Sequence, residues 1–211
     1  SVSCIQFPES GRELRYGKIP PADRKKNIVI VGGGPAGLKC ASVTAKRGHT
    51  VTLYEAHKNL GGQVLQAQKL PGREEFGTLV SNLAQECIDS GVTIHTNTFF
   101  SEEMISAKTA DTIVAATGAD CSPLPTVNFE DAHVFTLDDI LSNSANIGQS
   151  VLIADWRCDW VGAGIAELLT LRGCGVRLCV AGVTAAENVM PYVRDTLNAR
   201  LFDIGVEVIP Y

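Results

Sequence analysis

The amino-acid sequence predicts an α/β protein built on parallel sheets, and two patterns support this prediction. Short apolar segments alternate with amphipathic segments of helical length, the order expected of βαβ units. A glycine-rich turn, residues 31–37 (Val-Gly-Gly-Gly-Pro-Ala-Gly), joins the first apolar segment to the first helical one. Because right-handed crossovers place successive strands parallel, we expect the carboxyl ends of the strands to meet at one edge of the sheet.

The first half of the chain contains four predicted strands and two predicted helices. The strands are expected at 27–31, 50–54, 92–96 and 111–116, and the helices at 35–47 and 74–90. Apolar residues recur at helical intervals in the second helix, and Gly91 follows it as a stop signal. Residues 1–26 carry scattered glycines and prolines, so we expect an extended arm there.

The second half of the chain restarts the same pattern after a connector at 119–148. The expected elements are strands at 150–154, 175–180 and 206–209 and helices at 160–172 and 191–204. We therefore expect three parts. These are an arm at 1–26, a nucleotide-binding domain at 27–148, and the start of a second, degenerate domain at 149–211.

Composition limits the classes of partner. A net charge of -5 and a pI of about 5.4 argue against a nucleic-acid surface, which needs clustered cations. No apolar run reaches the length of a membrane span, and no signal peptide opens the sequence. Seven cysteines form no Cys-x-x-Cys pair, which indicates reduced thiols in a cytoplasmic protein and argues against a redox disulfide.

The spacing of the glycine-rich turn predicts a dinucleotide site. Gly32 would allow a sharp turn, Gly34 would let a pyrophosphate approach the backbone, and Gly37 would let the helix pack on the sheet. Free N–H groups at the helix start would then hold the phosphates. Glu55 follows the second strand, where an acidic side chain hydrogen-bonds an adenosine ribose. The alternative is a glycine-rich turn with a structural role only.

An ordered series of motifs also resembles one known family. In chain order they are Cys4-Ile5-Gln6, Gly11-Arg12-Glu13, the segment 28–37, the segment 47–55, Leu60-Gly61-Gly62-Gln63 and Ala115-Ala116-Thr117-Gly118. The series is similar to the C-terminal half of the trimethylamine dehydrogenase / 2,4-dienoyl-CoA reductase group. These are iron–sulfur flavoenzymes of the old yellow enzyme superfamily (NADH:flavin oxidoreductase-like). The resemblance covers about the first 120 residues.

The resemblance implies a Rossmann-like, glutathione-reductase-like fold that binds FAD, or ADP in its place. It also implies that a (β/α)8 barrel carrying FMN and the catalytic residues, followed by a 4Fe–4S cluster, precedes residue 1. We therefore expect no catalytic residue on this chain. Cys4 matches the fourth cluster ligand of the full-length protein, whereas on this chain alone it would be a free thiol, because the other three ligands would be upstream.

The same resemblance extends the predicted nucleotide site. Gly62 and Gln63 would lie against the pyrophosphate and flavin side, and Thr117 and Gly118 would approach the same ligand. The alternative for the first pair is a flexible hairpin. The complete set of expected contact residues is Gly32, Gly33, Gly34, Pro35, Ala36, Gly37, Glu55, Gly62, Gln63, Thr117 and Gly118. His49 and His57 are expected to be bystanders, and Trp156 and Trp160 to have packing roles.

The second half of the chain favours one branch of the family. Its first strand leads into 155–164 (Asp-Trp-Arg-Cys-Asp-Trp-Val-Gly-Ala-Gly), which lacks the phosphate-binding glycines and carries carboxylates that would repel phosphate. This degeneration resembles the amine dehydrogenase and demethylase branch, which passes electrons to an electron-transfer flavoprotein. The alternatives are a segment of an NAD(P)H-dependent enoate or dienoyl-CoA reductase and a non-catalytic ADP-binding module. A stand-alone disulfide reductase is disfavoured, and a homo-oligomer stays open.

Overall fold

The structure, a computed structural model, describes residues 4–107, 110–119 and 133–210. The chain forms two compact units, one of residues 1–68 with 74–123 and the other of residues 69–73 with 124–211. Each unit has a hydrophobic core of its own. The domain boundaries expected after residues 26 and 148 stay predictions, and much of the expected connector, at 120–132, lies outside the described residues.

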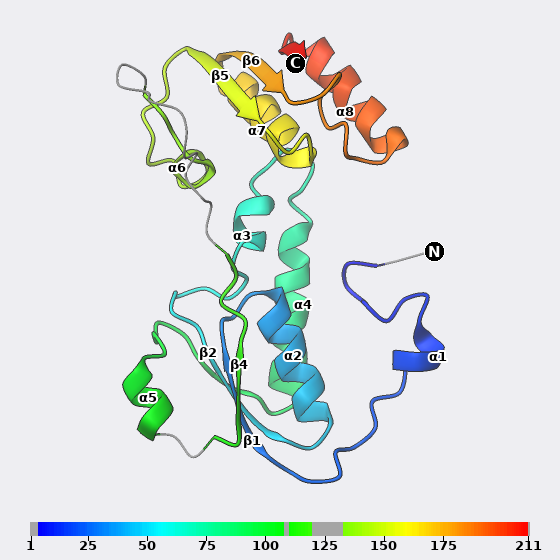
Figure 1. Ribbon diagram of the computed structural model, residues 1–211, viewed down its shortest axis with the longest axis vertical. Helices are drawn as coiled ribbons and strands as arrows, with labels where there is room; N and C mark the ends of the chain where they lie inside the picture. The colour runs from blue at the N-terminus through cyan, green and yellow to red at the C-terminus, as the bar shows by residue number, and fades with distance from the viewer. Residues whose placement is uncertain (1–3, 108–109, 120–132, 211) are drawn as a thin grey trace. The chain divides into compact units, whose positions relative to one another are not determined.

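A four-stranded parallel sheet forms the centre of the first unit. Its strands are β1 (Asn27–Val31), β2 (Thr50–Tyr54), β3 (Thr93–His95) and β4 (Thr112–Ala115), in the order β3-β2-β1-β4. Figure 1 labels β1, β2 and β4 of this sheet. Val31 at the end of β1 pairs with Tyr54 at the end of β2 and with Ala115 at the end of β4. This register aligns the carboxyl ends of three strands at one edge.

Two long helices supply the rest of the first core. Figure 1 shows α2 (Pro35–Lys46) and α4 (Phe76–Asp89) side by side, and the two helices are in contact. Apolar residues three or four positions apart form one stripe along each helix and face the sheet. The buried members of this core are Ile30, Leu38, Ala41, Val51, Leu53, Leu79, Val80, Leu83, Cys87 and Val92.

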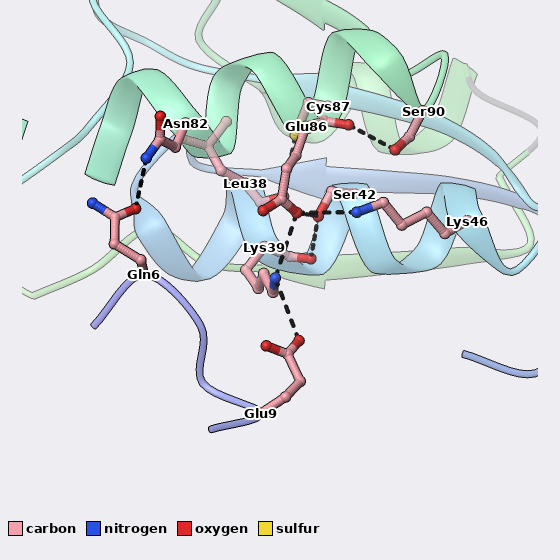
Figure 2. Close-up of polar contacts among 10 residues, drawn as sticks. All are labelled: Gln6, Glu9, Leu38, Lys39, Ser42, Lys46, Asn82, Glu86, Cys87 and Ser90. Carbon is pink, nitrogen blue, oxygen red and sulfur yellow. Dashed lines mark hydrogen bonds and ion pairs between the residues drawn. The ribbon is translucent and has the colours of Figure 1, made fainter. Parts of the chain in front are cut away.

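The N-terminal arm packs on the same helix pair. Figure 2 shows Gln6 beside Asn82 of α4, whose amide donates to the Gln6 side-chain oxygen at 3.0 Å. Glu9 pairs with Lys39 of α2 at 3.4 Å. The arm also contains one helical turn, α1 (Glu13–Tyr16), where we expected irregular chain.

Glu86 of α4 joins the two helices beneath the arm. Its Oε2 accepts from Lys46 at 3.1 Å, from the Ser42 hydroxyl at 3.3 Å and from Lys39 at 3.4 Å (Figure 2). Burial raises the pKa of Glu86, but the hydrogen bonds and charges of the two lysines outweigh it and hold the pKa below its usual value. The carboxylate therefore stays ionised and connects α2, α4 and, through Lys39, the arm.

The second unit is built on a three-stranded parallel sheet. Its strands are β5 (Ser150–Asp155), β6 (Gly175–Val180) and β7 (Glu207–Pro210), in the order β5-β6-β7. The helices α7 (Trp160–Leu171) and α8 (Pro191–Asp203) are in contact, and α7 packs on β6. The buried core includes Leu169, Leu178, Leu197 and Leu201.

The predicted α/β architecture is confirmed. Every expected strand and helix is present, and no end differs from the expected position by more than two residues. Three short helices beyond the arm were not expected: α3 (Val64–Ala67), α5 (Glu102–Ala107) and α6 (Leu137–Leu141). None of the described helices combines the length and the apolar character that crossing a bilayer requires.

Candidate nucleotide-binding site

The carboxyl edge of the first sheet brings together segments that are far apart in the sequence. β1 runs directly into the turn at Gly32–Gly34, β2 runs into Glu55, and β4 runs into Ala116 and Thr117. Because these three strands are parallel and in register, their ends lie at a common edge. The sequence-predicted residues of the turn, Glu55 and Thr117 are therefore neighbours in space.

Two glycines of the turn are required by close backbone packing. Gly32 has φ +109°, and a Cβ there would collide with the carbonyl oxygen of Ala116. A Cβ on Gly37 would collide with the carbonyl oxygen of Gly32. The first glycine thus allows the turn beside β4, and the second allows α2 to start against the turn.

Gly34 differs because the position that its Cβ would occupy is clear of the described residues. A Cβ on Gly34 would meet no described atom within 4 Å. Gly34 is also the N-cap of α2, and no side chain caps this helix within the described part of the chain. The intrahelical hydrogen bonds begin with the N–H of Leu38, which donates to the Gly34 carbonyl at 2.9 Å. The N–H groups of Gly34 and Ala36 precede that bond, so they are available to an anion at the helix start.

Glu55 is fixed at the end of β2 and is 7% exposed. Its Oε2 accepts from the Gly33 N–H at 2.7 Å, and its Oε1 accepts from the backbone N–H and the ring Nδ1 of His57 at 2.8 Å and 3.0 Å. Burial raises the pKa of Glu55, but these hydrogen bonds outweigh it and leave the pKa below its usual value. The side chain is therefore an ionised acceptor beside the glycine-rich turn.

The loop after β2 lies against this turn. The Gly61 N–H donates to the Gly33 carbonyl at 2.8 Å, and a Cβ on Gly62, where φ is +53°, would lie 3.3 Å from the Gly34 Cα. The Gln63 amide donates to the Ala119 carbonyl, just beyond β4. The predicted residue Gly62 thus lies close to Gly34, and Thr117 and Gly118 lie in the segment that Gln63 contacts.

The corresponding helix start in the second unit is filled by the chain's own carboxylates. Asp159 is the N-cap of α7 and accepts from the Val161 N–H at 2.8 Å. Asp155 accepts from the Arg157 and Cys158 N–H groups at 3.1 Å and 3.0 Å. A Cβ on Gly162 would collide with the Asp155 carboxylate, so that carboxylate lies against the first turn of α7.

The other singled-out residues have the following surroundings. Cys4 is half-buried, and no cluster of three His, Cys, Asp or Glu residues that could hold a metal ion occurs among the described residues. His49 accepts from the Lys26 N–H at 3.1 Å, at the amino ends of the strands. The Arg73 guanidinium lies 4.4 Å from the centre of the Trp160 ring, while Trp156 is 74% exposed. The His57 ring, which we expect to be a bystander to the chemistry, contacts Glu55 through Nδ1. This contact between residues two positions apart was not among the predicted ones.

Comparisons with known proteins identify the family of the chain. The model of the pyridine nucleotide-disulphide oxidoreductase family matches residues 26–210. The chain is 34% identical over 200 residues to the probable N-methylproline demethylase of Rhizobium meliloti (strain 1021), covering 90% of this chain and 29% of the relative. It is 30% identical over 207 residues to the NADH oxidase of Thermoanaerobacter brockii, covering 97% of this chain and 32% of that protein.

A solved structure shows the same fold. The histamine dehydrogenase from Rhizobium sp. 4-9 superposes with a TM-score of 0.88 at 24% identity, covering 99% of this chain and 34% of that one. The relatives confirm the resemblance to the trimethylamine dehydrogenase group of flavoenzymes. This chain spans about 30% of the length of these relatives.

Proposed function

The chain belongs to the pyridine nucleotide-disulphide oxidoreductase family, and from this premise we propose that its first unit holds the ADP half of FAD, or ADP itself. The observation that supports this most directly is the open space beside the Cβ position of Gly34, at a helix start that no described side chain caps. An adenine dinucleotide needs a backbone anion site and a ribose acceptor at the carboxyl ends of neighbouring strands. The Gly34 turn and Glu55 provide these two groups.

In this proposal each part of the site has a separate task. The N–H groups at the start of α2 hold the pyrophosphate, and Glu55 accepts a hydrogen bond from the adenosine ribose. Gly62, Gln63, Thr117 and Gly118 border the pyrophosphate and the side toward a flavin. A bound flavin would supply hydride or electron transfer, and the chain would position it.

For the whole protein we propose oxidation of an amine or N-methyl substrate at FMN, in a barrel outside this chain. The similarity to a probable N-methylproline demethylase, together with the short span of the match, supports this. Cys4 would then be the fourth thiolate of a 4Fe–4S cluster whose other ligands lie outside the chain. Electrons would leave to an electron-transfer flavoprotein, and the protein would be cytoplasmic.

The filled helix start of α7 supports the branch that uses no nicotinamide nucleotide. A pyrophosphate at that position would meet the carboxylates of Asp155 and Asp159, and the repulsion would oppose binding. The alternative is an NAD(P)H-dependent reductase, which the similarity to an NADH oxidase favours.

Two measurements on the purified protein test the proposal. The nucleotide released on denaturation is identified, and we expect FAD with its flavin absorbance, or colourless ADP if the nucleotide has a structural role only. Binding of NADPH is then measured by calorimetry, and we expect none. Release of no adenine nucleotide, together with no binding of added ADP or FAD, would overturn the site. Tight NADPH binding that is lost on changes in 155–164 would instead favour the reductase branch.

A further inference from the structure

We infer that His57 is a positioning residue of the nucleotide site, which orients Glu55 toward the ribose hydroxyls; this inference rests on the proposed function. The His57 ring Nδ1 lies 3.0 Å from Glu55 Oε1, the same oxygen that accepts from the His57 backbone N–H. The His57 side chain is 88% exposed while that of Glu55 is 10% exposed. The histidine ring thus contacts a buried carboxylate while being exposed itself.

The number of hydrogen bonds that the Glu55 carboxylate can accept explains how His57 would orient it. An ionised carboxylate offers about four lone-pair sites and no donor. The Gly33 N–H uses one site on Oε2, and the two groups of His57 use both sites on Oε1. One acceptor site is left, and it is on Oε2, the oxygen next to the glycine-rich turn. A ribose hydroxyl therefore has a single defined acceptor rather than a choice of two oxygens.

The backbone around His57 supports this geometry without the ring. The His57 carbonyl accepts from the Asn97 N–H at 3.0 Å, and the Glu55 carbonyl accepts from the Thr98 N–H at 2.9 Å. Both residues are therefore held by the segment that follows β3. Because these main-chain bonds do not involve the ring, replacing the ring should leave the fold intact and change only the constraint on Oε1.

The chemistry of the His57–Glu55 contact specifies which ring nitrogen donates the hydrogen bond. Since an ionised carboxylate can only accept a hydrogen bond, the donor in this contact is the Nδ1 nitrogen of the His57 ring and not its Nε2 nitrogen. An asparagine at position 57 could present an amide N–H in place of Nδ1, whereas a phenylalanine could not. The pair His57→Asn and His57→Phe therefore separates the donor from the bulk of the ring.

The test measures discrimination by the ribose as well as affinity. Dissociation constants of ADP, 2′-deoxy-ADP and 3′-deoxy-ADP are measured by calorimetry for the purified protein and both variants. We expect His57→Phe to weaken the binding of ADP roughly threefold to tenfold, the effect of one partly exposed hydrogen bond. The binding of the deoxy analogue that lacks the hydroxyl bound by Glu55 should weaken much less. In His57→Phe the preference for ADP over that analogue should therefore shrink. In His57→Asn the preference should return to that of the unaltered protein.

A matched control and the contrary outcomes complete the design. His49→Phe makes the same exchange at the amino ends of the strands and should leave all three constants unchanged. Thermal unfolding of each variant shows whether the fold is kept. Equal weakening of ADP and the deoxy analogues by His57→Phe, or no weakening at all, would overturn this inference alone. Failure of the unaltered protein to bind ADP would overturn the proposed function and this inference together.

Discussion

The helices that follow β1 and β5 begin in opposite ways. At α2 the N-cap is a glycine, no described side chain caps the helix, and a Cβ on Gly34 would meet no described atom. At α7 the N-cap is Asp159, and the Asp155 carboxylate lies against the first turn. Both helices follow the first strand of a parallel sheet. The same local fold can thus leave its helix start to a ligand anion or fill it with anions of its own.

The two arrangements have different consequences for stability. At α7 the chain supplies the anion permanently, but Asp155 is 7% exposed and its Oδ2 has no hydrogen-bond partner among the described residues. Burial therefore raises the pKa of Asp155, although the N–H groups of Cys158 and Arg157 lower it. At α2 the proposed nucleotide would bring the stabilising anion, and ligand concentration would then contribute to the stability of the first unit.

The largest effect is expected when the open helix start is blocked. Gly34→Val should weaken ADP binding roughly 5- to 150-fold, because a branched side chain would occupy the space proposed for the pyrophosphate, an overpacking cost of about 1–3 kcal/mol. Calorimetric titration with ADP measures the change. Gly148→Val is the control, since Gly148 also has no described atom near its Cβ but lies outside the site. Unchanged ADP affinity in Gly34→Val would place the nucleotide elsewhere.

The next effect concerns the filled helix start. Asp155→Ala should lower the free energy of unfolding of the second unit by about 1 kcal/mol, because the N–H groups of Arg157 and Cys158 lose their acceptor. Urea unfolding followed by tryptophan fluorescence measures it, since both tryptophans, Trp156 and Trp160, belong to this unit. Asp195→Ala, at an exposed carboxylate, should change little. A more stable Asp155→Ala protein would contradict the stabilising role of the carboxylate.

The pH dependence of stability should differ between the unaltered protein and Asp155→Asn. Because the folded-state pKa of Asp155 is raised, the folded protein holds this proton more tightly than the unfolded chain. The unaltered protein should therefore lose stability relative to Asp155→Asn as pH rises from about 3.9, the ordinary value, to above the raised pKa. Urea unfolding at a series of pH values measures the difference. A difference that stays constant with pH would contradict the assignment.

The smallest change in stability is expected when α2 is made to resemble α7. Gly34→Asp puts a capping carboxylate at the start of α2, in an extended conformation that aspartate adopts easily. The nucleotide-free protein should gain a few tenths of a kcal/mol, the usual difference between an aspartate cap and a glycine cap. ADP binding should weaken at the same time, because the added carboxylate would repel the pyrophosphate. Thermal unfolding with and without ADP measures both. Unchanged ADP binding by Gly34→Asp would contradict the proposal that a carboxylate at this helix start excludes the nucleotide.

The strands, the long helices and much of the candidate site could be predicted because their signals are local. Apolar spacing in segments such as 74–90 specifies a helix whatever its neighbours are, and Gly91 ends it. Gly32, Gly34 and Gly37 follow from the spacing of one motif. The four short helices could not be predicted in this way, because single turns such as α3 and α6 are too short to show a period.

Contacts between distant or irregular segments needed the tertiary structure. Gln63 reaches Ala119 only because the loop after β2 and the end of β4 lie at the same edge of the sheet. Residues 69–73 belong to the second unit, where Arg73 lies over Trp160, although they precede α4 of the first unit in the sequence. No local sequence pattern predicts either contact.

The sequence alone predicted where α2 and α7 start, and that the residue before α2 is a glycine while the residue before α7 is an aspartate, because N-cap chemistry is set by a few adjacent residues. It also determined that Glu55 would end the second strand. The hydrogen bond from Gly33 to Glu55 required the tertiary structure, because Gly33 reaches the carboxylate from the turn after β1, 22 residues earlier in the chain. Hydrogen-bond partners depend on distances between folded segments, and those distances are not encoded in any one segment.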